Sequence, residues 1–397
     1  MGVTPWYRTI TREQWRVLIA AKLGWMLDAM DFMIYAMAVG RLKTYFGFDD
    51  ATAGMLGTVT LAMSAIGGLI FGVVADRLTS QSVRQLLMWR ALLGIGMGGE
   101  WASGAVLVSE TWPPAHRNKA ISIVQSGWAI GYILAAVMAA AILGSPSLGP
   151  DSWRLLFVVG VLPAFLILWV RRNVPEPAVW TERRATGSRV RNPFAVIFGR
   201  ALIGRTLLVI LLGSTLQFAY WGIFFWLPGF LARPIAQGGA GMGIVGSLGW
   251  IIPVQIGAYF GYVTFGFIAD RIGRRRTFIV FMLAAATLVP IYGQMARSPL
   301  VLLLLGPVLG YVGHGYFSMF GSFVAELFPT PVRATGQGTS YNAGRLAGAL
   351  APYVIGVLAQ QPRIGIGLAL ASTSAFFLAS ALIIFALPDR SGQPLDA

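Results

Sequence analysis

The segment GFIADRIGRRR, at residues 266–276, decides the fold. It is a short charged turn between two long apolar runs, and the first half of the chain contains a counterpart, GVVADRL, at residues 72–78. A second related pair follows: SETWPPAHRNKA at 109–120 and AELFPTPVRATG at 325–336, each with a Glu and an Arg seven positions apart. Two such pairs in the same order predict that the chain consists of two halves that repeat one architecture.

The apolar runs around these segments have the length of membrane spans. The 397 residues are 56% hydrophobic and 11% charged, whereas soluble domains carry roughly 25% charged residues. A spanning helix needs about 20 largely apolar residues. The runs that meet this requirement are 17–39, 53–75, 86–109, 120–144, 154–170, 206–231, 247–269, 277–295, 300–324, 337–359 and 366–387. The sequence therefore predicts an all-α integral membrane protein with multiple spans.

The composition argues against several other functions. The net charge of +15 comes mainly from arginines between apolar runs, as in cytoplasmic membrane loops, so nucleic acid is not an expected partner. The chain has no cysteine and only two histidines, so neither disulfides nor a metal site are expected. An enzyme is not expected, because no Ser-His-Asp spacing, H-E-x-x-H motif or acidic metal cluster is evident. GIGMGG, at 94–99, fits a dinucleotide fingerprint but lies inside an apolar helical run.

The longest polar segment, at about 171–205, divides the chain and carries eight arginines. We therefore predict an N-terminal transmembrane bundle at 1–170, a cytoplasmic central loop at 171–205 and a C-terminal transmembrane bundle at 206–397.

The two halves differ in the spacing of their matching segments. Asp270 and Glu326 are 56 positions apart, but Asp76 and Glu110 are only 34 apart. The deficit equals one span, so the first bundle is expected to lack the third of twelve helices, with a gap near 78–85. Twelve spans would place both termini and the arginine-rich loops in the cytoplasm. Eleven ordinary spans would instead place the arginine-rich central loop outside the cell, against the positive-inside tendency. A natural deletion, a truncated gene model and an edited sequence all remain open.

These features resemble the major facilitator superfamily. RALLGIGMGGEWASGAVLVSETWPPAHRNKA, at 90–120, and GWMLDAMDF, at 24–32, resemble its branch of sialate–proton symporters and lactate and pyruvate permeases. The resemblance implies two six-helix bundles that rock around a central site and take up an organic anion with protons. No cofactor is expected, because the proton gradient would supply the driving force. We expect a monomer in the bacterial plasma membrane. The motif positions implied are Gly72, Asp76, Arg77, Gly266, Asp270, Arg271, Gly273, Arg274 and Arg275.

Ionisable residues at membrane depth are functional candidates because burying them is costly. For proton coupling they are Asp28, Asp31, Arg90, Glu100 and His314. Asp28 and Asp31 are three positions apart and share a helix face, which we expect to look into the bundle or a water-filled cavity. Arg90 matches the fourth-helix arginine that the resemblance implicates in proton transfer. The alternatives are a structural aspartate pair, salt bridges for Arg90 and Glu100, and a core histidine.

Arg345 is the main candidate for substrate binding. It lies about 12 residues, or ~18 Å, into a span that begins near Arg333, which is close to the membrane centre. A guanidinium there offers a bidentate clamp for a carboxylate, although an ion pair with a bundle carboxylate is an alternative. The polar residues expected to line the same cavity, each of which packing alone would also explain, are Tyr341, Asn342, Gln217, Tyr220 and Gln255.

The sequence thus favours proton-coupled symport of a small organic acid anion, such as a monocarboxylate, an aromatic acid or a sialate, by alternating access. A transporter of a neutral solute or drug is one alternative. A non-transporting remnant or sensor is another, because one helix is missing.

Overall fold

The structure is a computed structural model that describes residues 6–66, 108, 111–113, 116–160 and 192–388. Within these ranges the regular elements are helices. Those of the first half are α1 (Arg12–Phe46), α2 (Asp50–Ile66), α5 (Arg117–Gln125), α6 (Gly127–Leu143) and α7 (Ser152–Val159). Those that follow are α10 (Pro193–Ile197), α11 (Ile203–Phe224), α12 (Leu227–Ala232), α13 (Gly243–Ile272), α14 (Arg274–Gln294), α15 (Pro299–Gly315), α16 (Phe317–Ala325), α17 (Arg333–Gly348), α18 (Leu350–Gln360), α19 (Gly365–Ala371) and α20 (Ser374–Ala386). Short 3-10 turns lie at Trp6–Arg8, Pro146–Leu148, Ile235–Gln237 and Thr330–Val332.

Local sequence sets the ends of the first helix. Thr11 and Gln14 form a capping box at the start of α1, in which each side chain accepts a hydrogen bond from the other residue's backbone N–H. Gly47 ends the helix with a φ of 68°, a left-handed conformation that glycine adopts without strain. The resulting helix of 35 residues is longer than its predicted apolar run of 17–39.

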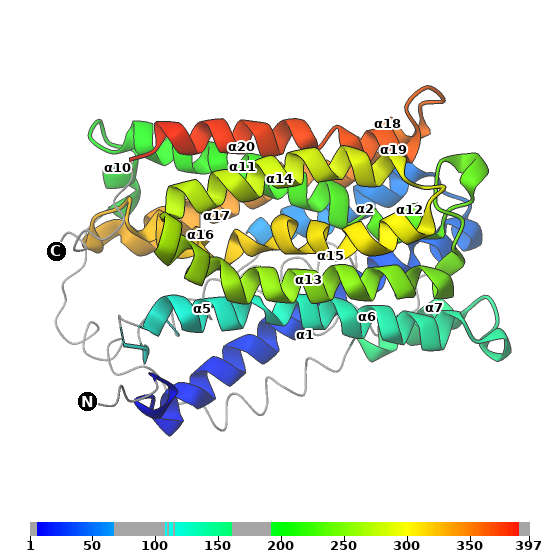
Figure 1. The fold of residues 1–397 in the computed structure, drawn as a ribbon, viewed down its shortest axis with the longest axis horizontal. Helices are drawn as coiled ribbons and strands as arrows, with labels where there is room; N and C mark the ends of the chain where they lie inside the picture. Colours follow the sequence, from blue (N-terminus) through cyan, green and yellow to red (C-terminus); the bar gives the residue numbers. More distant parts are fainter. Residues whose placement is uncertain (1–5, 67–107, 109–110, 114–115, 161–191, 389–397) are drawn as a thin grey trace.

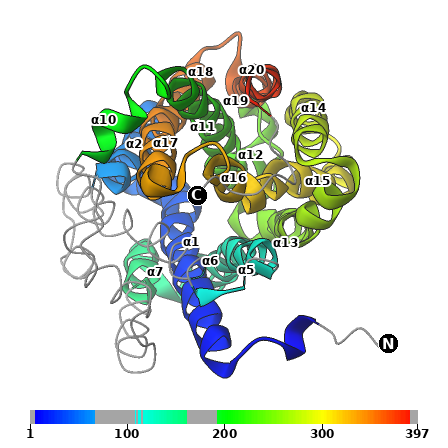
Figure 2. The same ribbon diagram turned by 90° about the vertical axis from the view of Figure 1, so that its left-hand side faces the viewer.

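The long helices lie side by side along a common direction, with the two ends of the assembly at the left and right of Figure 1. Figure 2 shows α1, α5, α6 and α7 on one side and α11 to α20 on the other. Within the halves α1 packs on α6, and α11 packs on α17 in the same way. Between the halves, α2 packs on α18 and α6 on α13. The repeat in the sequence therefore appears as two equivalent pairs of helices, α2 with α18 and α13 with α6, that meet across a central seam.

Helix α14 lies at the periphery of the second half. It follows the ADR turn directly and packs against α13, α15, α19 and α20, all of which belong to the same half. Its position in the repeat is that of the helix predicted to be missing from the first half. The predicted deficit therefore concerns the counterpart of a peripheral helix rather than of a seam helix.

Several long helices are interrupted by a turn. The interruptions lie at Ser126, at Phe225 and Trp226, at Tyr316, at Ala349, and at Ser372 and Thr373. Irregular backbone at membrane depth is tolerated where it is buried in protein or lines a cavity. Two of these turns lie within about one helical turn of predicted functional residues. Tyr316 comes two positions after His314, and Ala349 comes four positions after Arg345.

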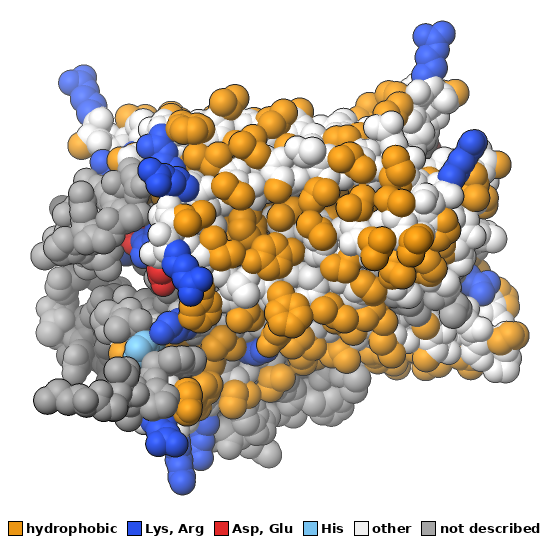
Figure 3. All heavy atoms as spheres, viewed as in Figure 1, with side chains coloured by type: hydrophobic (Ala, Val, Ile, Leu, Met, Phe, Trp, Pro, Cys, Tyr) orange, Lys and Arg blue, Asp and Glu red, His pale blue; other side chains and the backbone are white. Residues whose placement is uncertain are grey.

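The outer surface has the character of a membrane protein. Figure 3 shows hydrophobic side chains across the middle of one face and Lys and Arg side chains towards both ends. In the described part, five helical segments are long and apolar enough to cross a bilayer: Lys119–Leu143, Ile203–Ala232, Gly249–Ile272, Arg274–Gln294 and Gly365–Ala386. Large apolar side chains remain exposed, including Leu382 at 70% and Leu300 at 66%. The prediction of an all-α, multi-pass membrane protein is thereby supported.

We name the two ends of the assembly by residues. The Arg274 end carries the ADR turn between α13 and α14, together with the start of α1. The Asp50 end carries the start of α2, the loop after α12 and the loop between α18 and α19.

Candidate functional site

Arg345 is buried near the middle of the assembly. It lies in the last turn of α17 and is 1% exposed. Its Nε and Nη1 atoms are buried and have no hydrogen-bond acceptor within the described part of the chain. An uncompensated buried cation is strongly destabilising, so this geometry is expected at a site that an anion occupies during function.

Asp28 and Arg345 approach the same group from opposite halves. Both act electrostatically on the hydroxyl of Tyr341, which lies one turn before Arg345 on α17. Tyr341 is 6% exposed, and Asp28 is half-buried on α1. The structure therefore brings together three of the predicted site residues, two from the second half and one from the first.

Asp31 points to a different neighbour. A Cβ placed on Gly160, at the end of α7, would lie 2.8 Å from its Oδ1 atom, so the carboxylate lies against this helix of its own half. Residues three apart on a helix differ by about 60° around its axis, and this angle is enough to give the two aspartates different surroundings. Their proposed roles in proton coupling are therefore separable by mutation.

Gln217 on α11 and Asn342 on α17 are both hydrogen-bonded through their side chains. The Gln217 amide donates to the Tyr341 carbonyl at 3.1 Å, which joins α11 to α17 one turn before Arg345, and accepts from the Trp221 indole of its own helix at 3.4 Å. Asn342 donates to the Gly338 carbonyl at 2.9 Å and lines a groove of about 520 Å³ together with Phe194.

A cluster of buried neutral polar groups lies in the second half beside the break at Tyr316. Its members share one property, which is that each has a buried polar atom with no hydrogen-bond partner in the described residues. These atoms are His314 Nε2 and Tyr316 Oη at the break and, on α13, both amide atoms of Gln255. Buried polar groups are normally satisfied, so a concentration of unsatisfied ones indicates a place for a polar ligand or for water.

His314 is held by its other ring nitrogen. Nδ1 lies 3.0 Å from the Gly310 carbonyl oxygen, which can only accept, so Nδ1 carries the proton of this contact. The ring lies 5.1 Å from that of Tyr220 and 4.1 Å from that of Phe224, measured between centroids. Nε2 is thus left available on a histidine whose orientation is set by backbone and aromatic contacts.

Aromatic residues from both halves meet across the seam. Trp221 of α11 lies 4.7 Å from Phe32 of α1 and 5.7 Å from Trp128 of α6, measured between ring centroids. Trp128 in turn lies 4.8 Å from Trp25. The indole nitrogen of Trp25 is buried without an acceptor in the described residues. The seam therefore offers flat apolar surfaces and one further donor.

The combined arrangement suits a small organic anion. It provides a buried cation, a half-buried carboxylate in the opposite half, neutral polar groups and aromatic rings. Within the described residues no group of three or more His, Asp or Glu side chains has the arrangement of a metal site.

Comparison with known proteins gives the family. The family model described as Major Facilitator Superfamily matches residues 78–254. A putative metabolite transport protein of Haemophilus influenzae is 32% identical over 96% of this chain and 98% of its own length. The chain belongs to the Major Facilitator Superfamily. It is accordingly a multi-pass membrane transporter by family rather than an enzyme, as its sequence predicts.

Other superfamily members cover nearly the whole chain. A probable 4-methylmuconolactone transporter of Cupriavidus pinatubonensis is 33% identical over 98% of this chain and 94% of its own length. A cis,cis-muconate transport protein of Acinetobacter baylyi is 28% identical over 97% of both chains. A crystal structure of a D-xylose–proton symporter has the same fold, with a TM-score of 0.72 at 20% identity over 97% of this chain and 100% of its own.

The alignments also bear on length within the superfamily. The Haemophilus protein aligns over 412 positions, more than the 397 residues of this chain, so it contains residues that this chain lacks. The predicted deficit of one helix near 78–85 falls outside the described residues and stays a prediction.

The second copy of the superfamily loop motif joins three helices at the Arg274 end. Gly273 has a φ of 91° and lets the chain turn from α13 into α14. Arg274 forms an ion pair with Glu326, the residue directly after α16, and Arg275 donates to the Phe385 carbonyl of α20. Asp270 and Arg271 are exposed at the end of α13, and Gly266 lies on the same helix. The two repeated motifs found in the sequence are therefore in direct contact.

The predictions for Gly72, Asp76, Arg77, Arg90 and Glu100 lie outside the described residues. Conversely, sequence reasoning did not single out Tyr316 or Trp221. Tyr316 stands two positions from His314 in GYVGHGYF, but nothing in that pattern reveals that its hydroxyl is buried without a partner.

Proposed function

We propose that this chain is a proton-coupled symporter that imports a small organic acid anion by alternating access. The observation that carries the proposal is the burial of Arg345 with two guanidinium nitrogens lacking acceptors in the described residues. A carboxylate accepts two parallel N–H bonds from such a group. A neutral solute offers no anionic acceptor for these nitrogens, which disfavours the neutral-solute alternative.

The surroundings of Arg345 favour acids with an unsaturated or aromatic body. Trp221, Phe32 and Trp128 provide flat surfaces at the seam, and aromatic groups gain from offset or edge-to-face contacts with such rings. The unsatisfied polar atoms of Gln255, His314 and Tyr316 would bind oxygen or nitrogen atoms elsewhere on the substrate. The names of the relatives, which include muconolactone and muconate transporters, agree with this substrate class.

Proton coupling follows from the pairing of Asp28 with Arg345 around Tyr341. Without substrate, an ionised Asp28 offsets the charge of Arg345. When a carboxylate binds Arg345, two anionic groups face one cation, and protonation of Asp28 restores the charge balance that a desolvated site requires. Anion and proton would then cross together.

The orientation of the chain in the membrane is inferred from the positions of its arginines. With the Arg274 end in the cytoplasm, as the positive-inside tendency favours, the Asp50 end faces outwards. At that end the halves are in close contact: a Cβ on Gly54 of α2 would lie 2.3 Å from the Pro352 carbonyl oxygen of α18, and the Trp226 indole of the second half donates to the same oxygen at 2.9 Å. These contacts fit a state that is closed to the outside of a bacterial inner membrane.

Uptake of labelled benzoate, nicotinate and cis,cis-muconate into proteoliposomes tests the proposal. We expect accumulation of at least one acid that rises with an inward proton gradient and is lost in Arg345→Gln. Arg363→Gln, which removes an exposed arginine at the Asp50 end, is the matched control and should transport normally. Uptake that ignores the proton gradient would refute coupling.

A non-transporting remnant is the second candidate, favoured by the length deficit relative to the Haemophilus protein. The peripheral packing of α14 argues against it, because the counterpart of α14 would not line the seam. Absence of uptake for every acid tested, with a chain that binds one of them, would favour the remnant.

A further inference from the structure

A second cavity lies at the Asp50 end, separate from the Arg345 site. It has a volume of about 440 Å³ and is bounded by the end of α1, the start of α2, α12 with the following loop, and the start of α13. This volume falls within the range of small-molecule sites. Its lining includes three cationic side chains, Arg41, Lys43 and Arg233.

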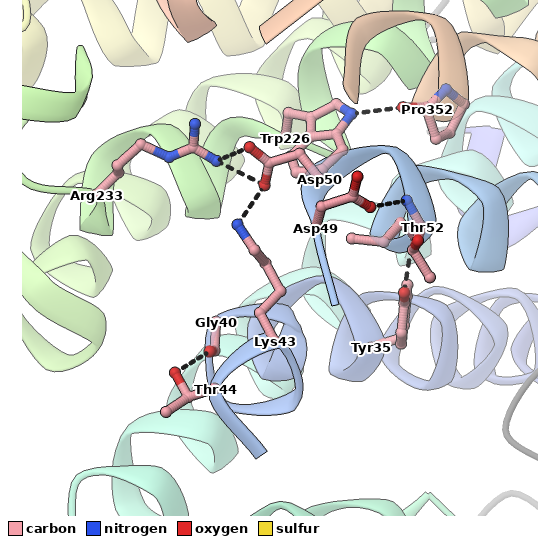
Figure 4. A network of polar contacts seen from close by, with 11 residues as sticks. Tyr35, Gly40, Lys43, Thr44, Asp49, Asp50, Thr52, Trp226, Arg233 and Pro352 are labelled. Carbon is pink, nitrogen blue, oxygen red and sulfur yellow. Dashed lines mark hydrogen bonds and ion pairs between the residues drawn. The ribbon is translucent and has the colours of Figure 1, made fainter. Parts of the chain in front are cut away.

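The charges in this cavity do not balance. Asp50 is the one carboxylate among the described residues that line it. Lys43 Nζ lies 2.5 Å from Asp50 Oδ1, and Arg233 Nη2 lies 2.9 Å from both Asp50 oxygens (Figure 4).

The other charged residues at this end do not neutralise the cavity. Arg41 donates to the Leu143 carbonyl, which carries no charge, at 3.1 Å. The nearby Asp49 caps α2 through the Thr52 N–H at 2.8 Å and does not line the cavity. The cavity lining thus carries three cationic side chains and one carboxylate, and two of the three cations contact that carboxylate.

Arg233 has donors left over. Both of its contacts with Asp50 come from Nη2, and Figure 4 shows the other terminal nitrogen pointing away from the carboxylate. The side chains of Lys43 and Arg233 are 29% and 13% exposed, so the surrounding solution reaches them. A partly shielded cluster with excess positive charge raises the local concentration of anions.

We propose that this cavity is an outer binding site for small organic carboxylates, held by Arg233 and Lys43. That its ligand is also the transported substrate rests on the function proposed above. The site lies between the halves, because Asp50 and Lys43 belong to the first half and Arg233 to the second. A bound carboxylate competes with Asp50 for Arg233, which weakens a charged contact across the seam at the closed end.

The packing around Asp50 connects this competition for Arg233 with the contacts that close the Asp50 end. A Cβ on Gly356 of α18 would lie 2.5 Å from the Asp50 carbonyl oxygen, so α18 packs directly on this residue. Trp226, which donates to Pro352 of α18, also lines the cavity. Ligand binding in the outer site therefore acts on the residues that hold α2, α12 and α18 together.

Binding of 4-fluorobenzoate to the purified full-length protein, followed by ¹⁹F NMR, tests the site independently of transport. The Arg345→Gln background removes the central site, and 4-fluorobenzamide serves as the neutral control. We expect residual benzoate binding in Arg345→Gln that weakens about tenfold on adding Arg233→Gln, as for loss of one charge-assisted hydrogen bond. Adding Arg363→Gln instead should leave it unchanged.

A variant with the opposite sign excludes misfolding as the explanation. Asp50→Asn frees Arg233 and Lys43 from their carboxylate, so we expect several-fold tighter benzoate binding in the Arg345→Gln background. Equal affinity in the Arg233→Gln and Arg363→Gln backgrounds, or weaker binding in Asp50→Asn, would overturn the outer site. Failure of the transport proposal alone would leave this binding pattern intact, so the two failures are distinguishable.

Discussion

Asp28 and Arg345, from opposite halves of the chain, both act on the hydroxyl of Tyr341. A movement that separates the halves therefore changes the distance between the carboxylate and the guanidinium. This relationship gives a physical basis for coupling, because occupation of Arg345 by an anion and protonation of Asp28 depend on each other. It also makes the two residues testable as a pair.

Arg345→Gln is expected to lower carboxylate uptake by about 100-fold, because a bidentate charge-assisted contact is lost. The melting temperature should fall, since removal of Arg345 leaves the half-buried Asp28 without the cation that offsets its charge. Arg345→Lys keeps the charge but not the planar fork and should retain partial uptake. Uptake assays combined with thermal unfolding in detergent check both effects. Normal uptake by Arg345→Gln would remove this residue from the mechanism.

Asp28→Asn is expected to abolish proton-driven accumulation and to preserve exchange of labelled for unlabelled acid. Asparagine retains the polar shape of aspartate but cannot bind and release a proton. Counterflow in proteoliposomes without a gradient measures exchange, and an imposed pH difference measures accumulation. Asp151→Asn, at a side chain that is 59% exposed, is the matched control. Accumulation at the wild-type level in Asp28→Asn would assign the proton to another residue.

Gln255→Leu is expected to stabilise the fold while weakening substrate binding. Both amide atoms of Gln255 are buried without partners in the described residues, so an apolar side chain of similar size avoids a desolvation cost of about 1–3 kcal/mol. Thermal unfolding and the KM for uptake report the two effects. The exposed Gln361→Leu should change neither. A destabilised Gln255→Leu would show that the amide is satisfied in the native protein.

Cross-linking of the Asp50 end is expected to stop transport. The chain has no cysteine, so Asp50→Cys and Arg233→Cys introduce the only thiols, and a short bis-thiosulfonate reagent can join them. Because these residues belong to different halves, the link prevents the opening that alternating access needs. Reduction should restore uptake, and each single variant should be insensitive. Full transport by the cross-linked protein would contradict opening at this end.

The orientation can be checked with the same cysteine-free background. Arg363→Cys at the Asp50 end should react with a membrane-impermeant maleimide in intact cells. Arg276→Cys at the Arg274 end should react only after permeabilisation, since arginine-rich loops favour the cytoplasm. Both side chains are exposed, so accessibility to solvent does not distinguish them. The reverse labelling pattern would show that the chain is inserted the other way.

Sequence alone determined the fold class, the two-fold repeat and the family resemblance, because apolar run length and repeated motifs are local properties of the chain. It also pointed to Arg345 and Asp28, since a charge inside an apolar run is visible without coordinates. The membership of the superfamily and the all-helical architecture confirm the fold class and the family resemblance, while the roles of Arg345 and Asp28 stay predictions.

Only the tertiary structure decided which of the polar residues meet. Asp28 and Asp31 look equivalent in the sequence, but Asp31 is buried with its carboxylate against Gly160, whereas Asp28 is half-buried. The unsatisfied state of Gln255 and the contact of Asp50 with Arg233 arise from packing between segments far apart in the chain. Such contacts depend on the relative placement of helices, which the period and composition of each helix leave open.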